Sequence, residues 1–404
     1  MMNDAMLDGL TILDMSQGIA GPYCGLLLGQ QGARVIKVEP PTGDWSRQMG
    51  RAVDGQTAIS IAYNAGKESV VLDTRTPQGR KTLIALAEKA DIIIQNFRPG
   101  VAASMGVEYE VLAKRNPKLV YCSISAYGHT GPDAHRAGFG LIAEAKSGIM
   151  QMVGTPGEPP PLLRISLGDM YTGIHAVAAI NAALLGRVKS GQGQHIDMAL
   201  YDTLVSMHEY AVQCYTLSGG QEVPVQTGHD MPTSTLYGVF RAQDGDLVIA
   251  AQVDDAWKRF AALVEQRGGP AGFAADARFH TSAGRNAHRL DILAVVKPWV
   301  AAQRVADVLA MLDAIDVPGA KVQRIDEVLA DPQIQARGMV LEQDHPVLGK
   351  IKLPNLPFHF SGCDTTITQV APDLGQHNTE IAASVGFSAE QIAAMQQDGV
   401  LYSA

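Results

Sequence analysis

The chain has 404 residues, of which 46% are hydrophobic, and a formal net charge of −9 at pH 7. This length exceeds what one hydrophobic core usually fills, so we expect two domains. The negative charge argues against a protein that binds nucleic acid or an anionic membrane surface. The four cysteines are scattered and form no CxxC pair, so we expect neither disulfides nor a metal site. The apolar stretches are too short to span a bilayer, and the sequence does not start with a basic and apolar leader. These features favour a cytoplasmic protein.

Short apolar runs alternate with helical segments along the first 200 residues. Strands that are almost continuous apolar runs and alternate with helices are typical of a parallel sheet that is covered on both faces. The pattern predicts a doubly wound, Rossmann-like α/β domain, in which ligands bind outside the carboxyl ends of the strands. The expected strands are residues 10–15, 34–39, 69–73, 91–96, 118–124 and 194–198.

The phosphate-binding and hydrolase motifs that often accompany such a domain are missing. The turn after the first strand reads Ser16-Gln-Gly-Ile-Ala-Gly-Pro22 and lacks the G-x-G-x-x-G fingerprint. The sequence also contains no Walker A loop, no HExxH and no G-x-S-x-G elbow. These gaps argue against a nicotinamide oxidoreductase, a P-loop enzyme, a zinc protease and a serine hydrolase.

The pattern changes after residue 217. Residues 218–235 contain the loop of Gly219, Gly220 and Gln221, which suits a linker or an active-site lid. A hairpin around residues 237–250, followed by two helical segments at 255–266 and 290–302, predicts a smaller α+β domain over residues 236–327. Residues 328–404 form the last part, in which we expect a helical restart at 328–332, strands within 345–360 and a final helix over 388–397.

One acidic residue stands out near the middle of the chain. A proline-rich approach ends at Pro161, Gly168 permits a turn, Asp169 follows, and a helix is predicted from Met170 to Arg187. An Asp just ahead of a helix is most often an N-cap. The same placement also suits a carboxylate nucleophile with backbone N–H donors nearby. Both interpretations stay open at this level.

Taken together, a series of short motifs in fixed order resembles the family III CoA-transferases, of the formyl-CoA and carnitinyl-CoA transferase type. The motifs run from near the start of the chain to near its end. They are residues 7–14, 32–39, Gly43-Asp44, Arg47, Asn64, Lys67, Leu72-Asp73, 96–100, Gly168-Asp169, 191–194, Asp197, Asp331-Pro332 and 374–377.

The resemblance implies a large α/β domain built from both chain ends, residues 1–217 and 328–404, with the small domain between them. It also implies an interlocked homodimer, Asp169 as the nucleophile, and coenzyme A as a substrate with no further cofactor. Arg75 suits a CoA phosphate. By motif, the CoA contacts would be Gly18, Ile19, Ala20, Leu72, Arg75, Asn96, Val101, Met105 and Phe139.

Some positions depart from the family pattern. Ser104 stands where the family often has Arg, and Pro40 where it has a basic residue, so part of the phosphate contacts must differ. The family usually has an acidic residue near the position of Gly140, so this chain lacks one candidate orienting carboxylate. Related 2-methylacyl-CoA racemases carry a His-Asp pair at the positions of Phe139 and Gly140, and without that His a racemase lacks one of its two bases.

The expected activity is transfer of CoA from an acyl-CoA to a free carboxylic acid through an aspartyl anhydride and an aspartyl-CoA thioester. Two alternatives are a racemase on the same fold and a non-catalytic CoA-binding protein. The acids are not legible in the sequence. Residues that suit a second carboxylate, as in a short dicarboxylic acid such as succinate, are Arg47, Arg164, His175 and His229.

Overall fold

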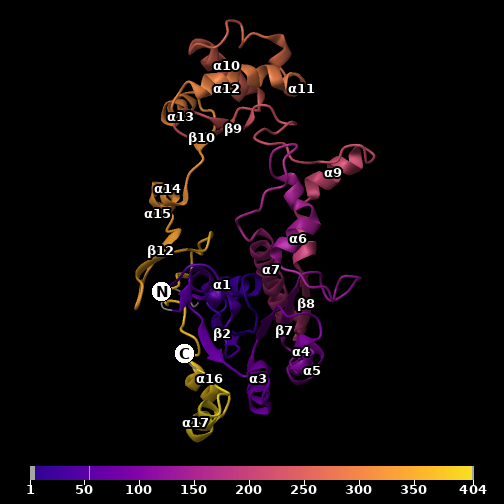
Figure 1. The fold of residues 1–404 in the computed structure, drawn as a ribbon, viewed down its shortest axis with the longest axis vertical. Coiled ribbons are helices and arrows are strands. Elements are labelled where there is room, and N and C mark those ends of the chain that lie inside the picture. Colours follow the sequence, from indigo (N-terminus) through magenta and orange to yellow (C-terminus); the bar gives the residue numbers. More distant parts are fainter. Residues whose placement is uncertain (1–4, 54, 403–404) are drawn as a thin grey trace. The chain divides into compact units, whose positions relative to one another are not determined.

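A computed structural model describes residues 5–53 and 55–402 of the chain (Figure 1). The chain divides into two compact units. The first unit comprises the described residues of Met1–Ile149, Leu163–Gln213 and Pro332–Ala404, so it contains both ends of the chain. The second comprises Met150–Leu162 and Cys214–Asp331, which places the expected linker 218–235 within it.

A six-stranded parallel sheet forms the centre of the first unit, as the alternating pattern predicted. The strand order is β5-β2-β1-β6-β7-β8, so the direction of winding reverses between β1 and β6. At such a switch point the loops after the two strands part and leave a crevice for a ligand. The strands are β1 (Thr11–Asp14), β2 (Arg34–Glu39), β5 (Glu68–Val71), β6 (Ile92–Gln95), β7 (Val120–Ser125) and β8 (Gln194–Ala199).

Helices cover both faces of this sheet because successive side chains of a strand point to opposite faces. Ile12 packs in the core beneath α1 (Ala20–Gln30) and α7 (Leu167–Ser190). Its neighbour Leu13 packs in the opposite core, beneath α3 (Pro77–Lys89). That second core also holds residues of α5 (Tyr109–Arg115), α16 (Asn378–Ser384) and α17 (Ala389–Gln397).

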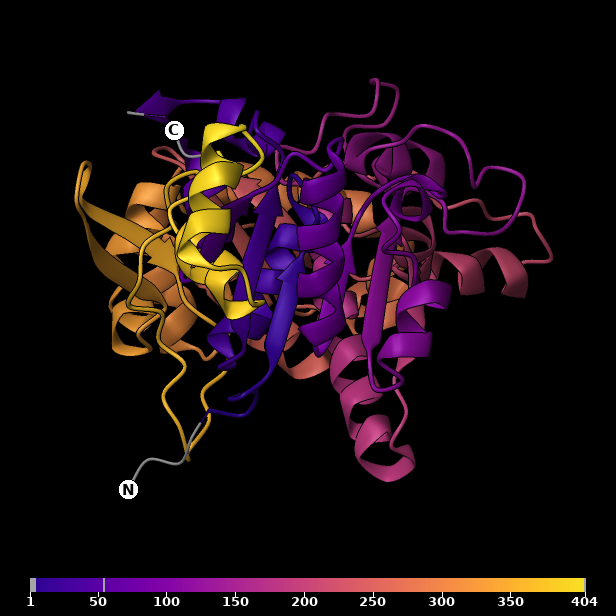
Figure 2. The same ribbon diagram turned by 90° about the horizontal axis from the view of Figure 1, so that it is seen from below.

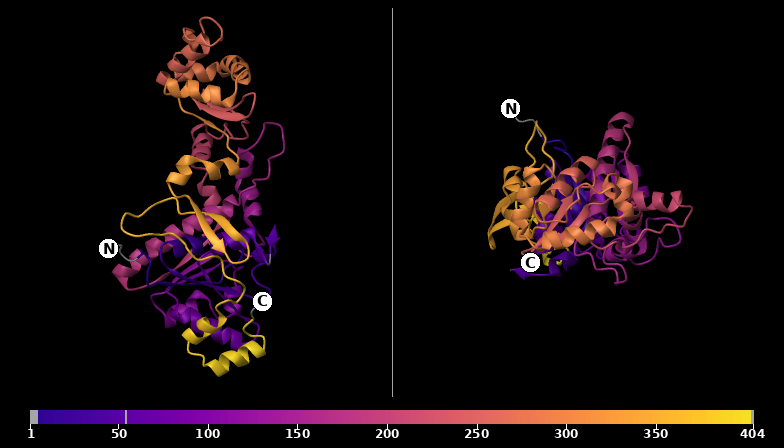
Figure 3. Two further views of the ribbon diagram at one scale, coloured as in Figure 1. Left: turned by 90° about the vertical axis from the view of Figure 1, so that its left-hand side faces the viewer. Right: turned by 90° about the horizontal axis from the view of Figure 1, so that it is seen from above.

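The C-terminal segment completes the first unit. Helices α16 and α17, yellow in Figure 2, pack against the strands of the N-terminal half through Ile381 and Met395. The antiparallel hairpin of β12 (Val340–His345) and β13 (Gly349–Pro354), orange in Figure 3, contributes Leu353 to a small core with Leu26 of α1. Further elements of this unit are η1 (Trp45–Gln48), β3 (Ala52–Val53), β4 (Gln56–Thr57), α2 (Ala58–Asn64), α4 (Val101–Ser104), α6 (Gly140–Ser147), α8 (Leu200–Ser206) and α15 (Pro332–Ala336).

The second unit is an α+β structure with its own core. Its three-stranded antiparallel sheet has the order β11-β10-β9 and contains the predicted hairpin of β9 (Tyr237–Arg241) and β10 (Asp246–Ala250). Trp257 and Phe260 of α10 (Asp254–Gln266) are at the centre of the core. The other elements are β11 (Gly319–Lys321), η3 (Ala277–Phe279), α11 (Ser282–Ala287), α12 (Arg289–Ala301), α13 (Val305–Ala314) and α14 (Ile325–Ala330), while η2 (Ile149–Met152) and α9 (Glu209–Leu217) span the boundary between the units.

Several expected element boundaries are wrong. Helix α7 begins at Leu167, so Asp169 lies inside its first turn and not ahead of it. The helix expected over 199–217 is two helices, α8 and α9. The segment 328–332 contains a break, because α14 ends at Ala330, Asp331 is extended before a proline, and α15 begins at Pro332. Among the described residues, no helix combines the length and apolar character needed to span a membrane.

Candidate active site

A group of buried charges underlies the crevice between β1 and β6. Asp14 ends β1, and its carboxylate pairs with Lys67 at 2.8 Å; Lys37 of β2 pairs with Asp44, also at 2.8 Å. All four side chains are at most 1% exposed. Burial alone would raise the pKa of Asp14, but the ammonium groups of Lys67 and Lys37 hold that pKa below its ordinary value. Asp14 is therefore ionised and paired at neutral pH.

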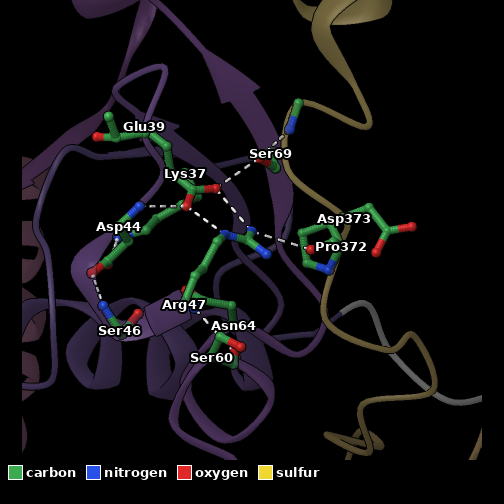
Figure 4. A network of polar contacts seen from close by, with 12 residues as sticks. Lys37, Glu39, Asp44, Ser46, Arg47, Ser60, Asn64, Ser69, Pro372 and Asp373 are labelled. Carbon is green, nitrogen blue, oxygen red and sulfur yellow. Dashed lines mark hydrogen bonds and ion pairs between the residues drawn. The ribbon is translucent and has the colours of Figure 1, made fainter. Parts of the chain in front are cut away.

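A second buried pair extends this group to the C-terminal segment (Figure 4). Arg47 donates to both oxygens of Glu39, at 2.7 and 2.9 Å, and to the carbonyl oxygen of Pro372 at 3.2 Å. The hydroxyl of Ser69 donates to the same carboxylate at 2.8 Å. Each cation of this cluster therefore has a carboxylate partner, which a buried charge requires.

These charges fix the loop that follows β1. The carboxylate of Asp44 accepts the backbone N–H groups of Gly18 at 3.0 Å and Ser46 at 2.9 Å. Gly18 has φ +79°, and a Cβ there would lie 2.0 Å from the ring of Trp45, so glycine is required on both counts. Asn96, after β6, clamps the other side of the loop: its amide accepts the N–H of Gln17 at 2.8 Å and donates to the Gln17 carbonyl at 2.6 Å.

The loop lines a pocket of about 260 Å³ at the carboxyl ends of the strands. Asp169 contributes to its wall, together with four of the residues that the sequence assigned to CoA binding: Ile19, Ala20, Asn96 and Phe139. Phe139 is 66% exposed. The remaining wall residues are Gln17, Trp45, Phe97, Arg98, Ile124, Ser125, Ala126, Gly138 and Leu200.

Asp169 is the third residue of α7, whose N-cap position is taken by Ser166. Among the described residues, no hydrogen bond to its side chain is found, so Asp169 does not act as the cap that a sequence reading would favour. Burial, together with the negative charge of Glu144, raises the pKa of Asp169 to about 6. The carboxylate fits against the backbone of Gly140, where a Cβ would lie 2.1 Å from Asp169 Oδ2.

A second cavity of about 100 Å³ adjoins the pocket, with which it shares Gln17 and Phe97. Leu72 and Met105, two further residues from the CoA prediction, line it, as does Pro40. Its other wall residues are Met15, Val38, Glu39, Thr74 and Leu83. The two cavities together follow the sheet edge from Asp169 to the end of β5.

The remaining predicted residues lie elsewhere. The Arg75 side chain is 83% exposed and pairs with Asp73 at 2.8 Å, and Val101 is 40% exposed at the start of α4. Gly219, Gly220 and Gln221 follow α9 in the second unit. Arg47, which the sequence offered for a substrate carboxylate, has its guanidinium occupied by Glu39, so it belongs to the framework beneath the loop.

The other candidates for a second carboxylate are also separate from the pocket wall. Arg164 is exposed ahead of α7. His175 lies within α7, where its ring packs on Tyr171 with centroids 4.3 Å apart. His229 is an exposed residue of the second unit.

Sequence reasoning missed several residues of the pocket. Arg98 follows Asn96 within a motif that was recognised, but only Asn96 was selected from it. Gln17 lies in the loop after the first strand. Ligands of such a fold bind beside the loops at the carboxyl ends of the strands, so its position alone could have marked it as a pocket residue. Glu144, which lies outside the pocket wall and accepts the Gly168 N–H, gave no such signal, since its neighbourhood depends on how α6 packs on α7. No cluster of three or more metal-binding side chains occurs among residues 5–53 and 55–402.

Comparison with known proteins identifies the family. Residues 7–378 match the family described as CoA-transferase family III. The chain belongs to the family III CoA-transferases. The succinate–glutarate CoA-transferase of Agrobacterium fabrum is 33% identical over 391 residues, covering 94% of this chain and 95% of that protein. The succinyl-CoA–D-citramalate CoA-transferase of Chloroflexus aurantiacus is 33% identical over 399 residues, covering 98% of each.

The fold agrees with that of a solved structure. A CAIB/BAIF family protein from Brucella suis is 34% identical to this family III CoA-transferase and superimposes with a TM-score of 0.85. The match covers 95% of this chain and all of the other. The expected activity, transfer of CoA between an acyl-CoA and a free carboxylic acid, is thereby confirmed at the level of the family.

Proposed function

We propose that this CoA-transferase moves CoA from an acyl-CoA to a short dicarboxylic acid, and that Asp169 carries first the acyl group and then CoA. The observation that supports this most directly is the state of the Asp169 carboxylate. It lies in a pocket at the switch point of a parallel sheet, its pKa is raised to about 6, and no hydrogen bond from the described residues engages it.

A carboxylate without a hydrogen bond can act as the nucleophile of the transfer reaction. A carboxylate oxygen of Asp169 attacks the carbonyl carbon of the thioester, the C–S bond breaks, and CoA leaves as the thiolate. The thiolate then attacks the Asp169 carbonyl carbon of the resulting anhydride, and the donor acid leaves as a carboxylate. The acceptor acid reverses both steps. A thioester is exchanged for a thioester, so the protein contributes orientation and charge stabilisation more than driving force.

Donors for the developing oxyanion are available at the start of α1. Ile19 and Ala20 line the pocket, and the first backbone N–H groups of a helix have no partner within that helix. The loop that presents them is held by Asp44 and by Asn96, which limits reorganisation during reaction. The buried charges beneath the loop thus serve the site indirectly.

CoA would extend from Asp169 past Phe97 into the cavity of Leu72 and Met105. A third, open pocket of about 610 Å³ begins at Met105 and is lined by Arg80, Lys81 and Arg115. Cationic side chains suit the CoA phosphates, and these provide positive charge on the surface where Ser104 replaces the usual arginine. Arg75 lies outside the walls of all three pockets, and its side chain is turned to Asp73.

A dicarboxylic acceptor is supported by the pocket wall and by the relatives. Arg98 lines the same pocket as Asp169, and its cationic side chain can pair with a second carboxylate. The named relatives act on succinate and glutarate, and on succinyl-CoA and D-citramalate. A monocarboxylic acid would leave Arg98 without a partner in the pocket.

Two further features belong to the same proposal. An interlocked homodimer would cover apolar side chains that α7 exposes, of which Leu185 is 62% and Val188 83% exposed. The loop of Gly219, Gly220 and Gln221 remains the lid that the sequence predicts for keeping water from the anhydride. Both glycines have a positive φ, so this turn tolerates few other residues.

The proposal is tested by trapping the covalent enzyme. Wild-type protein incubated with succinyl-CoA should gain the mass of CoA less one water on the peptide that contains Asp169. Asp169→Asn should fold, bind CoA and lose transfer by about three orders of magnitude or more, because an amide cannot form the anhydride. Asp202→Asn, an exposed acid in the first turn of α8, is the matched control and should keep full activity. Transfer by Asp169→Asn above a few per cent would overturn the assignment of Asp169.

A further inference from the structure

Glu144 of α6 is a buried acid that the mechanism above does not use. Its side chain is 2% exposed, and among the described residues it forms no ion pair. Its Oε1 accepts the backbone N–H of Gly168, on α7, at 3.1 Å. Burying a carboxylate without a cation is costly, and the one hydrogen bond from Gly168 offsets only part of that cost.

The surroundings of Glu144 leave it little freedom. A Cβ on Gly168 would lie 3.1 Å from Leu204 Cδ1 of α8, 3.6 Å from the Gly140 carbonyl oxygen and 3.7 Å from Glu144 Cγ. Helices α6, α7 and α8 therefore meet closely around the first turn of α7. The side chain of Glu144 is held in this contact by packing as well as by the Gly168 N–H.

The Glu144 contact concerns the residue directly before the nucleophile. An acidic side chain in the first turn of a helix ordinarily competes for the free N–H groups there. At this helix the N–H of Gly168 is already taken by Glu144, and the Asp169 carboxylate faces the pocket and Gly140 without a hydrogen bond from the described residues.

We propose that Glu144 is a positioning residue for the nucleophile: it takes the Gly168 N–H, which leaves the Asp169 carboxylate free for attack, and it holds a second negative charge beside it. The inference rests on the proposed role of Asp169 and adds a residue to it. Glu144 does not touch the substrate pocket, whose wall does not include it.

The charge has a consequence for the covalent intermediates. Two neighbouring carboxylates repel while both are ionised. Acylation of Asp169, like protonation, removes its charge, so the repulsion is relieved in the anhydride and in the aspartyl-CoA thioester. The free enzyme is raised in free energy relative to both intermediates, which increases the share of enzyme that carries CoA at steady state.

Other ionisable groups face Asp169 from the neighbouring elements. Tyr63 of α2 is close enough for the Asp169 charge to contribute to the raised pKa of its phenol, after burial and Tyr23 of α1. Arg98 shares the pocket wall. The pKa values of Tyr63 and Tyr23 are both raised, so neither phenol adds negative charge near pH 6, and Glu144 is the acidic neighbour whose charge, after burial, raises the pKa of Asp169.

The test separates the hydrogen bond from the charge. Glu144→Gln keeps an oxygen that can accept from Gly168 and removes the charge, whereas Glu144→Ala removes both. The first readout is the pH midpoint for modification of Asp169 by a water-soluble carbodiimide, followed by peptide mass, which needs no transfer activity. The second is the fraction of enzyme that carries CoA during turnover with succinyl-CoA. Glu110→Gln, an exposed position on α5, is the control for the loss of one charge.

In Glu144→Gln, the midpoint for Asp169 should fall by about one pH unit and the CoA-bearing fraction should fall several-fold, with an unchanged melting temperature. Glu110→Gln should leave both readouts as in the wild type. An unchanged midpoint in Glu144→Gln overturns the inference, even if Glu144→Ala fails to fold. A lowered midpoint in a protein that never forms the covalent enzyme would instead contradict the proposed role of Asp169 while the coupling to Glu144 stands.

Discussion

The neighbourhood of Asp169 illustrates what single residues decide. The sequence drew attention to Asp169, because a Gly-Asp pair ahead of a helical run belongs to a recognisable set of motifs. The cap interpretation was wrong because the helix begins at Leu167, three residues before the expected start at Met170, and so places Asp169 third. The contact with Gly140 and the effect of the Glu144 charge were not predictable, since both depend on the packing of two helices that residues 148–166 separate along the chain.

Gly140 provides a sharp test of this geometry. A methyl group at Gly140 would occupy the position of Asp169 Oδ2, and the side chain must rotate away. Gly140→Ala should therefore lower kcat by about 100-fold, since a displacement of about 1 Å at the reacting group can have that effect. Stability should change little, because the atom that must move is the end of a side chain and alanine suits the start of a helix.

The matched control is Gly186→Ala on α7, where an added Cβ would meet nothing within 4 Å. This variant should keep full activity and gain about 0.5–1 kcal/mol of stability, as expected for alanine within a helix. Steady-state kinetics and urea unfolding distinguish the two. If Gly140→Ala retains wild-type kcat, the carboxylate does not react from this position.

At the scale of elements, the sheet was the most predictable part. Its strands are nearly continuous apolar runs, and each was located within one or two residues. The helix expected over 199–217 was wrong for the opposite reason: the sequence has neither Gly nor Pro to mark the break between Ser206 and Glu209. The role of Arg47 was also hidden, because one of its acceptors, Pro372, lies 325 residues away in the chain.

The two Arg–Glu pairs of the first unit should differ in how much they contribute to the free energy of unfolding. Arg47 and Glu39 are 9% and 1% exposed, whereas Arg34 and Glu68 are 43% and 29% exposed with equally short contacts. Arg47→Ala should lower the free energy of unfolding by about 3–5 kcal/mol, because it leaves the Glu39 carboxylate buried without a partner. Arg34→Ala should lower it by at most about 1 kcal/mol.

Urea unfolding at pH 7 measures both variants. A double variant, Arg47→Met with Glu39→Gln, removes the buried charge together with its partner and should recover part of the loss. Equal effects of Arg47→Ala and Arg34→Ala would show that the buried cluster does not hold the loop after β1 in place, and the role given to that cluster would then fall.

At the scale of the whole molecule, the chain closes on itself within the first unit. Leu401 forms a bridge with Leu72, and the side chain of Asn378 accepts the N–H of Val71 at 2.8 Å. Composition and periodicity gave no sign of this return, because a pairing over more than 300 residues leaves no local pattern. The family resemblance did predict it, since the motif at 374–377 was part of that resemblance.

The pH dependence of stability also belongs to this scale, because it sums over all ionisable groups. Burial would raise the pKa values of Asp14, Glu39 and Asp44, but neighbouring Lys and Arg side chains lower them below their ordinary values of 3.8 to 4.5. Such groups add stability above the unfolded pKa, and this stability is lost as the pH falls through the folded pKa. Below about pH 4 the protein should therefore lose stability steeply.

The effect of Asp169 on the pH dependence of stability is the opposite of that of these acids. Its folded pKa of about 6 is above the unfolded value of 3.8, so the folded protein binds a proton more tightly than the unfolded chain. Stability from this group is present at low pH and lost as the pH rises toward 6. Between pH 8 and pH 5 the free energy of unfolding of the wild type should rise by on the order of 1 kcal/mol more than that of Asp169→Asn, because each pKa unit corresponds to about 1.4 kcal/mol.

Urea midpoints of the two proteins at pH 8, 7, 6 and 5 measure the difference. Parallel pH profiles would mean that the pKa of Asp169 is ordinary, and the explanation of its reactivity by a buried, repelled carboxylate would be wrong.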